Sequence, residues 1–259
     1  MEQFQHPPVG GQQPLIDAVA RRLHEEWKRT SIMPKHIVKA YLNGETIWCD
    51  RGSTPPNADI LYSANLADVT FEGLPSHWQA KYLSAANFVA PAVMSALDGN
   101  SELSIRQTVG LACQVHEAWK LRHAWVSDPH HGDPIRAVTY SDLPTGLQYE
   151  CLKDVLTTLT VVGSTIEVTP EEVNIPDDYS SMWILPGVQI ENVDPIGAND
   201  YQGMVGVTIQ DPRAVPFFYK NTDKSKIYGS ARQINYTKVE SLEELASIVN
   251  TLLSRILQR

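Results

Sequence analysis

Residues 116–125 read HEAWKLRHAW and place histidine and tryptophan where a helix could present them for chemistry. Ser104 and Gln107 predict a capping box at the start of this helix. Apolar spacing then predicts one face that contains Ile105, Val109, Ala112, His116 and Trp119. A histidine on such a face either hydrogen-bonds within the core or lines a pocket as an acid, base or ligand. Glu117 points about 100° away around the helix, so the core interpretation is favoured.

The loop that follows, VSDPHHGDPIR, brings together four possible metal ligands, namely Asp128, His130, His131 and Asp133. A zinc site needs a framework that fixes the geometry of its ligands. These residues lie among two prolines and a glycine, and neighbouring histidines tend to diverge. The sequence therefore favours an exposed loop over a metal site.

Composition limits the classes of partner. The formal net charge of −9 and the lack of a local Lys/Arg cluster argue against nucleic acid. No apolar run approaches the roughly 18 residues of a membrane span, and the first residues do not resemble a secretory signal, so a cytoplasmic location is expected. The three cysteines show no CxxC spacing, which argues against a disulfide framework and a thiolate zinc site. No cofactor is predicted.

Helical periodicity organises the first part of the chain. An amphipathic helix is expected from Pro14, a residue suited to a first helical position. Residues 44–60 are predicted to form a turn-rich connection. Ser76 and Gln79 predict a capping box for a further helix, and Pro91 is expected to end or kink it.

The character of the chain changes after residue 163. Segments rich in β-branched and aromatic residues predict strands, and these are SMWILPGVQI, GMVGVTIQ, AVPFFYKN and IYGSARQINYTKV. A final helix within residues 241–258 carries an apolar stripe of Leu242, Leu245, Val249, Leu252 and Ile256. This stripe either packs on its own sheet, which is favoured, or joins two chains in a homo-oligomer.

The predicted fold class is therefore α+β. A flexible tail at residues 1–13 precedes a mainly helical domain at 14–163. An α+β domain at 164–259 follows, with a small mixed or antiparallel sheet and a C-terminal amphipathic helix.

The segment LACQVHEAWKLRHAW, followed by DP, AVTYSDLP and YECLKDVLTTLTVVG, resembles the repeat domain of ryanodine receptors in its bacterial or phage form. The matching positions are Val115, His116, Trp119, Trp125, Pro134, Tyr140, Asp142, Leu143, Pro144, Leu152, Leu156 and Leu159. The likeness covers about residues 14–163. It implies a compact, mainly helical domain used for packing or recognition, and similar domains have been suggested to sense nucleotide-derived signals.

The expected function is non-catalytic recognition of a protein partner or of a small ligand, for example a nucleotide-derived one. The candidate binding residues are His116, Trp119, Arg122, Trp125, Arg136 and Tyr140. Trp125 and Tyr140 could stack a base, and Arg122 or Arg136 could meet a phosphate, although the same aromatic rings could instead fill the core.

Two other classes remain open. An enzyme acting on a nucleotide or a related small molecule would use His116, His123, His130 or His131 as acid or base, with a carboxylate in the same pocket. A structural subunit of a larger assembly would carry an exposed apolar patch.

Overall fold

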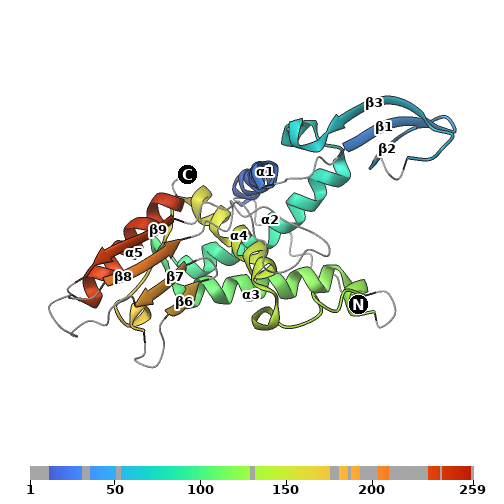
Figure 1. Cartoon of the computed structure of the whole chain (residues 1–259). Coiled ribbons are helices and arrows are strands. Elements are labelled where there is room, and N and C mark those ends of the chain that lie inside the picture. Colours follow the sequence, from blue (N-terminus) through green and yellow to red (C-terminus); the bar gives the residue numbers. More distant parts are fainter. Residues whose placement is uncertain are drawn as a thin grey trace. The chain divides into compact units, whose positions relative to one another are not determined.

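The computed structural model describes residues 12–30, 36–50, 54–128, 132–175, 181–185, 188–192, 204–209, 233–239 and 241–257 (Figure 1). These residues form two compact units, described separately below. The first unit contains the described residues up to Ala86, and the second contains those from Asn87 onward. The fold is α+β with a C-terminal helix, as the sequence predicts. Within the described ranges, no helix has the length and apolar character that a bilayer crossing requires.

Helix α1 (Gln13–Thr30) supplies much of the first unit's core and confirms the predicted amphipathic helix. Its buried face consists of Ile16, Val19, Ala20, Leu23, His24 and Glu26. The His24 Nε2 lies 2.9 Å from the carbonyl oxygen of Val69, and its ring meets Tyr82 edge-on at 5.1 Å between centroids. The buried Glu26 carboxylate is paired with Arg22 and Arg29, which compensates for its removal from water.

A three-stranded antiparallel sheet replaces the turn-rich connection predicted for residues 44–60. Its strands are β1 (His36–Leu42), β2 (Glu45–Asp50) and β3 (Asp59–Asn65), in the order β2-β1-β3. The β1–β2 turn is Asn43-Gly44, with φ of 51° and 89°. Asn-Gly is a strong hairpin signal because both residues tolerate positive φ. The prediction was wrong because it gave more weight to the surrounding polar and proline residues than to this dipeptide.

Helix α2 (Ser76–Leu97) runs through Pro91, so the proline does not end it. The predicted capping box does not form, because Ser76 is already the first residue of the helix. The Gln79 side chain instead donates to the carbonyl oxygens of Glu72 and Leu74, at 3.2 and 2.9 Å. These bonds fix the turn that precedes the helix. The boundary between the two compact units falls inside α2.

Two helices form the centre of the second unit (Figure 1). Helix α3 (Ile105–Arg122) begins with the predicted capping box, in which Ser104 and Gln107 exchange hydrogen bonds. Helix α4 (Thr145–Val162) packs against α3 and ends at Gly163, whose φ of 72° is the left-handed conformation of many helix C-termini. The core face of α4 includes Leu152, Val155, Leu156 and Leu159.

Two short strands precede and follow this helical pair in the chain. Strand β4 (Glu102–Ser104) immediately precedes α3, and β5 (Thr165–Glu167) follows α4. The two strands pair in parallel, with Leu103 opposite Ile166, and both of these side chains are buried. A single turn of 3-10 helix, η6 (Glu171–Val173), follows β5.

The predicted strands of the second half form a four-stranded antiparallel sheet in sequence order. They are β6 (Ser181–Leu185), β7 (Val188–Asn192), β8 (Met204–Ile209) and β9 (Gln233–Lys238). The segment AVPFFYKN lies outside the described residues, as do the tail at residues 1–11 and the loop histidines 130 and 131.

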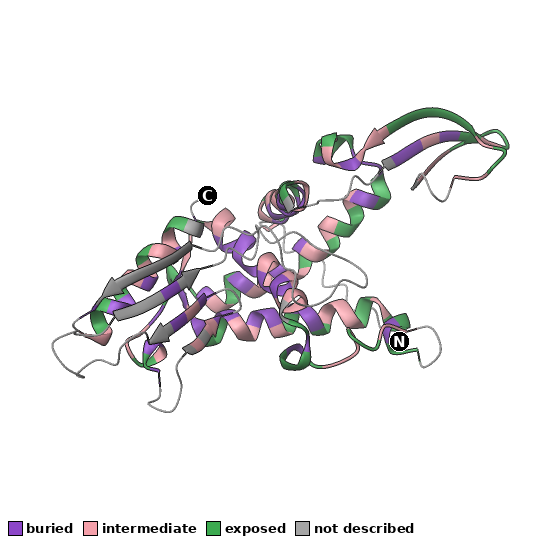
Figure 2. Cartoon of the chain, in the orientation of Figure 1, coloured by how far each residue is buried: buried purple, intermediate pink, exposed green. Residues whose placement is uncertain are grey.

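Helix α5 (Leu242–Leu257) packs within its own unit, against β5, β8, η6 and α4. Its buried residues are Leu245, Ala246, Val249, Leu253 and Leu257 (Figure 2). This agrees with the favoured intrachain interpretation, although Leu253 is buried where the sequence predicted Leu252.

The contacts divide the chain inside α2, and not after residue 163, where the sequence predicts the domain boundary. Helices α4 and α5 belong to the same compact unit, and the Thr160 hydroxyl donates to the carbonyl oxygen of Leu257 at 3.0 Å. The helical pair and the C-terminal helix therefore share a core.

Candidate functional site

The predicted binding residues gather around the end of α3, but several are already engaged within the protein. His116 is only 3% exposed, and its Nε2 lies 2.9 Å from the carbonyl oxygen of Val138. The Lys120 ammonium donates to the same oxygen at 3.4 Å. These bonds attach α3 to the segment before η5 (Tyr140–Asp142), so His116 lies where the core interpretation places it.

Trp119 contacts two planar groups. The imidazole of His123 stacks on it with 4.5 Å between centroids and 19° between planes, and the Arg136 guanidinium lies 5.0 Å from the indole centroid. Arg136 also pairs with Glu150 at 3.2 Å and with Asp133 at 3.6 Å. Two carboxylates therefore already balance the Arg136 charge, which leaves this guanidinium poorly suited to bind a phosphate.

The carboxylates of α4 have perturbed acidities. Burial raises the pKa of Glu150, against the opposing charges of Arg136 and Lys153. Burial also raises the pKa of Asp154 to about 6, while the charges of Lys153 and Arg122 act in the opposite direction. Burial lowers the pKa of Arg122, and the Asp154 carboxylate opposes this effect. Helix α4 thus holds two carboxyl groups whose ionised forms are disfavoured by desolvation.

Tyr140 is 7% exposed and does not offer a ring face to a ligand. Its hydroxyl donates to the carbonyl oxygen of Gln148 at 3.4 Å, and the Gln148 amide returns a bond of 3.2 Å to the Tyr140 carbonyl oxygen. Burial raises the pKa of the Tyr140 phenol. The Tyr140 ring therefore fills the core, which is the alternative to ligand stacking that the sequence left open.

Three large apolar side chains are exposed along the segment that ends α3 and follows it. Leu121 is 82% exposed, Trp125 is 54% exposed and Ile135 is 55% exposed. Trp125 lies in η4 (Ala124–Ser127). Of the six predicted binding residues, Trp125 is the aromatic one with the most accessible ring.

The candidate metal loop is only partly described, because residues 129–131 lie outside the described ranges. The Asp133 carboxylate accepts a hydrogen bond from the Ile135 backbone N–H at 3.1 Å as well as pairing with Arg136. Within the described parts of the chain, no three His, Cys, Asp or Glu residues are grouped so that they could hold a metal ion.

A second exposed apolar surface lies on the sheet of the first unit, where the sequence predicted none. We call it the sheet patch, and it consists of Tyr41, Ile60, Leu61 and Tyr62, which are 46 to 58% exposed. Tyr41 and Tyr62 share a face of this sheet, because Tyr62 pairs with Lys39, two positions before Tyr41. Ile60 pairs with Ala40 and so points to the other face, and the patch therefore wraps around the edge strand β3. Figure 2 shows β3 exposed along much of its length.

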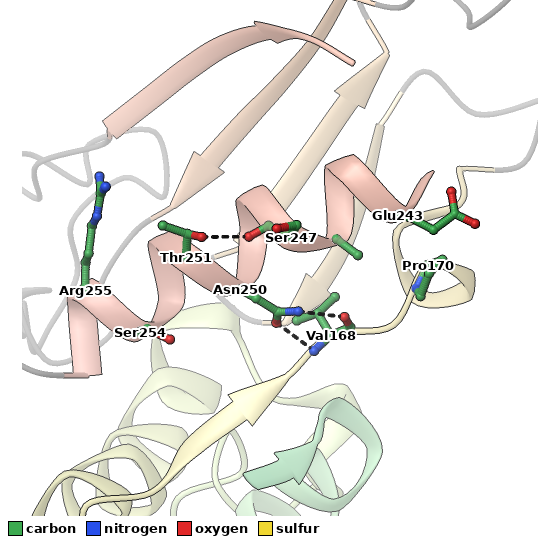
Figure 3. A pocket seen from close by; sticks show the side chains of 9 residues that line it. Val168, Pro170, Glu243, Ser247, Asn250, Thr251, Ser254 and Arg255 are labelled. Atoms are coloured by element: carbon green, nitrogen blue, oxygen red, sulfur yellow. Dashed lines mark hydrogen bonds between the residues drawn. The ribbon is translucent and has the colours of Figure 1, made fainter. Parts of the chain in front are cut away.

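A groove of about 600 Å³ runs along α5 in the second unit (Figure 3). Its lining residues are Val168, Pro170, Glu243, Ala246, Ser247, Asn250, Thr251, Ser254 and Arg255. The sequence contained a signal for it, since polar residues recur on the face of α5 opposite its apolar stripe. Only the fold could show that the segment after β5 forms the other wall.

Comparison of the chain with protein-family models, curated proteins and solved structures found no match. The resemblance to the ryanodine-receptor repeat therefore stays a prediction that rests on the sequence pattern.

Proposed function

We propose that this chain is a non-catalytic recognition module that binds another protein, and that the sheet patch makes the contact. The observation that carries the proposal is the exposure of Tyr41, Ile60, Leu61 and Tyr62 on two paired strands. Monomeric proteins rarely leave large apolar side chains clustered in water, and aromatic residues are enriched in protein interfaces. Burying this cluster against a partner would remove its apolar surface from water.

Contacts between side chains hold part of this surface in a fixed arrangement. On its face the Lys39 ammonium lies 5.7 Å from the Trp48 ring centroid, and the Trp48 and Tyr62 rings meet edge to face at 6.3 Å. Tyr62 is therefore held by a ring neighbour while 51% of its surface stays exposed. An ordered aromatic residue loses little side-chain entropy when a partner covers it.

A small ligand remains the second candidate, because the Trp125 ring is accessible beside Arg122 in the chain. Arg136, Trp119 and Tyr140 contribute less to such a site than the sequence indicates, since they make the internal contacts described above. The enzyme alternative requires a histidine in contact with a carboxylate. His24, His116 and His123 are instead bonded to backbone carbonyl oxygens, and the proposal assigns no reaction.

The test is capture of a partner by the full chain from an extract of the organism that encodes it. The variant Ile60→Lys/Tyr62→Lys places two charges on the patch, at an edge strand that tolerates lysine. Met94→Lys is the matched control, because Met94 is a similarly exposed apolar residue of α2 outside the patch. Circular dichroism and thermal unfolding would verify the folding of each variant.

We expect one protein to be captured by the wild type and by Met94→Lys, but not by the double variant. The purified partner would then be titrated into each chain by calorimetry, with an expected loss of at least about tenfold in affinity for the double variant. Equal affinity for all three chains would refute the role of the sheet patch.

A further inference from the structure

The groove along α5 has a fixed wall. The Asn250 side chain accepts a hydrogen bond from the Val168 backbone N–H at 2.8 Å and donates to the Val168 carbonyl oxygen at 2.9 Å (Figure 3). The Thr169 backbone N–H donates to the Glu172 carboxylate at 3.0 Å. Because α5 is anchored in the core by Leu245, Val249, Leu253 and Leu257, the groove exists before any ligand arrives.

Its polar side chains recur with a regular spacing. Glu243, Ser247, Asn250 and Ser254 follow one another at i, i+4, i+7 and i+11, which aligns them on one face of α5. No described residue hydrogen-bonds the hydroxyl groups of Ser247 and Ser254. These two residues are seven positions apart, or roughly 10 Å along a helix, which is also about the distance spanned by three residues of an extended chain.

The two ends of the groove carry opposite charges. Hydrogen bonds to its own backbone and from Ser241 hold the pKa of Glu243 below its usual value, so this carboxylate is ionised at neutral pH. Arg255 lies at the other end, and no carboxylate of the described residues pairs with it. Twelve helical positions separate them, which corresponds to roughly 18 Å and to five or six residues of extended peptide.

We propose that this groove binds an extended peptide of about six residues from another protein. A basic residue of the peptide lies at Glu243, and an acidic residue or a terminal carboxylate lies at Arg255. The hydroxyls of Ser247 and Ser254 bond to peptide groups between these ends, and the Pro170 side chain provides apolar surface on the other wall. Opposite charges at the two ends give the bound peptide a single direction.

This inference is independent of the sheet patch, because the groove lies wholly in the second unit. It is tested by panning a phage-displayed library of random peptides against the full chain. The charge-reversed variant Glu243→Lys/Arg255→Glu is panned in parallel. A matched control, Glu102→Lys/Arg106→Glu, reverses one charge of each sign at exposed positions of the same unit outside the groove.

We expect the wild type and the matched control to enrich peptides with a basic and an acidic residue about five positions apart, in one order. The charge-reversed variant should enrich the opposite order. A synthetic peptide of the selected sequence should bind the wild type at least about tenfold more tightly than the charge-reversed variant, as measured by fluorescence anisotropy.

Three results would overturn the proposal: no enrichment on a folded wild-type chain, enrichment whose charge order does not change with the reversal, or self-association of the wild type that the reversal abolishes. The last result would assign the groove to a second copy of the chain. Since Ile60→Lys/Tyr62→Lys leaves the groove intact, it should bind the selected peptide normally, which separates this test from that of the sheet patch.

Discussion

Asp154 in α4 should make the second unit less stable as the pH rises from about 4 to 7. Its pKa in the folded chain is about 6, against an ordinary value of 3.8, because burial disfavours the carboxylate. The folded state thus holds this proton more tightly than the unfolded state does. The stabilising effect of the protonated group is complete at low pH and is lost as the pH rises through 6.

The magnitude follows from the shift. A difference of about two pKa units at 1.36 kcal/mol per unit corresponds to about 3 kcal/mol. Asn is close to Asp in shape and carries no charge, so Asp154→Asn removes this term. Relative to the wild type, the free energy of unfolding of Asp154→Asn should increase by about 2 kcal/mol between pH 4 and pH 7, because the unfolded-state carboxyl is already partly ionised at pH 4.

The assay is urea unfolding of both chains at several pH values across this range, followed by circular dichroism and tryptophan fluorescence. Glu167→Gln is the control, because it makes the same change from a carboxylate to an amide at an exposed position of β5 in the same unit. Arg122→Gln should raise the pKa of Asp154 further, because the Arg122 charge favours the carboxylate. A difference between Asp154→Asn and the wild type that does not vary with pH would refute the reasoning.

Three further substitutions test individual contacts by chemical denaturation. His116→Ala should cost about 2–4 kcal/mol, because it opens a cavity and removes the bond to Val138; equal stability to the wild type would contradict this. Asn250→Ala should cost about 2–3 kcal/mol, because both backbone groups of Val168 lose their partner, and Asn250→Asp should restore only the bond from the N–H. Ser104→Ala should cost about 1 kcal/mol through loss of the α3 cap, whereas Ser104→Asp should retain most of it.

The elements with strong periodicity could be predicted from the sequence. The helices α1, α3, α4 and α5 and the later strands each carry a pattern that spans most of their length, and the capping box of α3 marks its start to the residue. Sheet β1–β3 was missed because β3 leaves successive apolar side chains in water and so lacks an alternating pattern. The sheet forms through two pairings of β1, one with β2 across the Asn43-Gly44 hairpin and one with β3 further along the chain.

The candidate site was predicted less completely, because its contacts join distant positions. The stripe on α3 indicated that His116 is buried, but the partner carbonyl is 22 residues away on an irregular segment. Likewise, nothing in the residue types specified that Arg136 would reach Trp119 and Glu150, since this depends on the path of the loop between α3 and α4. Exposure of Leu121 and Trp125 could not be inferred from apolar character, which favours burial.

The parallel pairing of β4 with β5 determines how this unit can open. Each strand has only three residues, so the ladder cannot persist alone. Strand β4 leads directly into α3 and β5 follows α4, so the two strands meet when these helices pack together. We therefore expect amide hydrogens in this ladder to exchange with solvent only when the helical pair comes apart. Their exchange rate would report the slowest opening of the unit. In deuterium oxide, these amides should be protected for longer than the amides at the ends of α3 and α4.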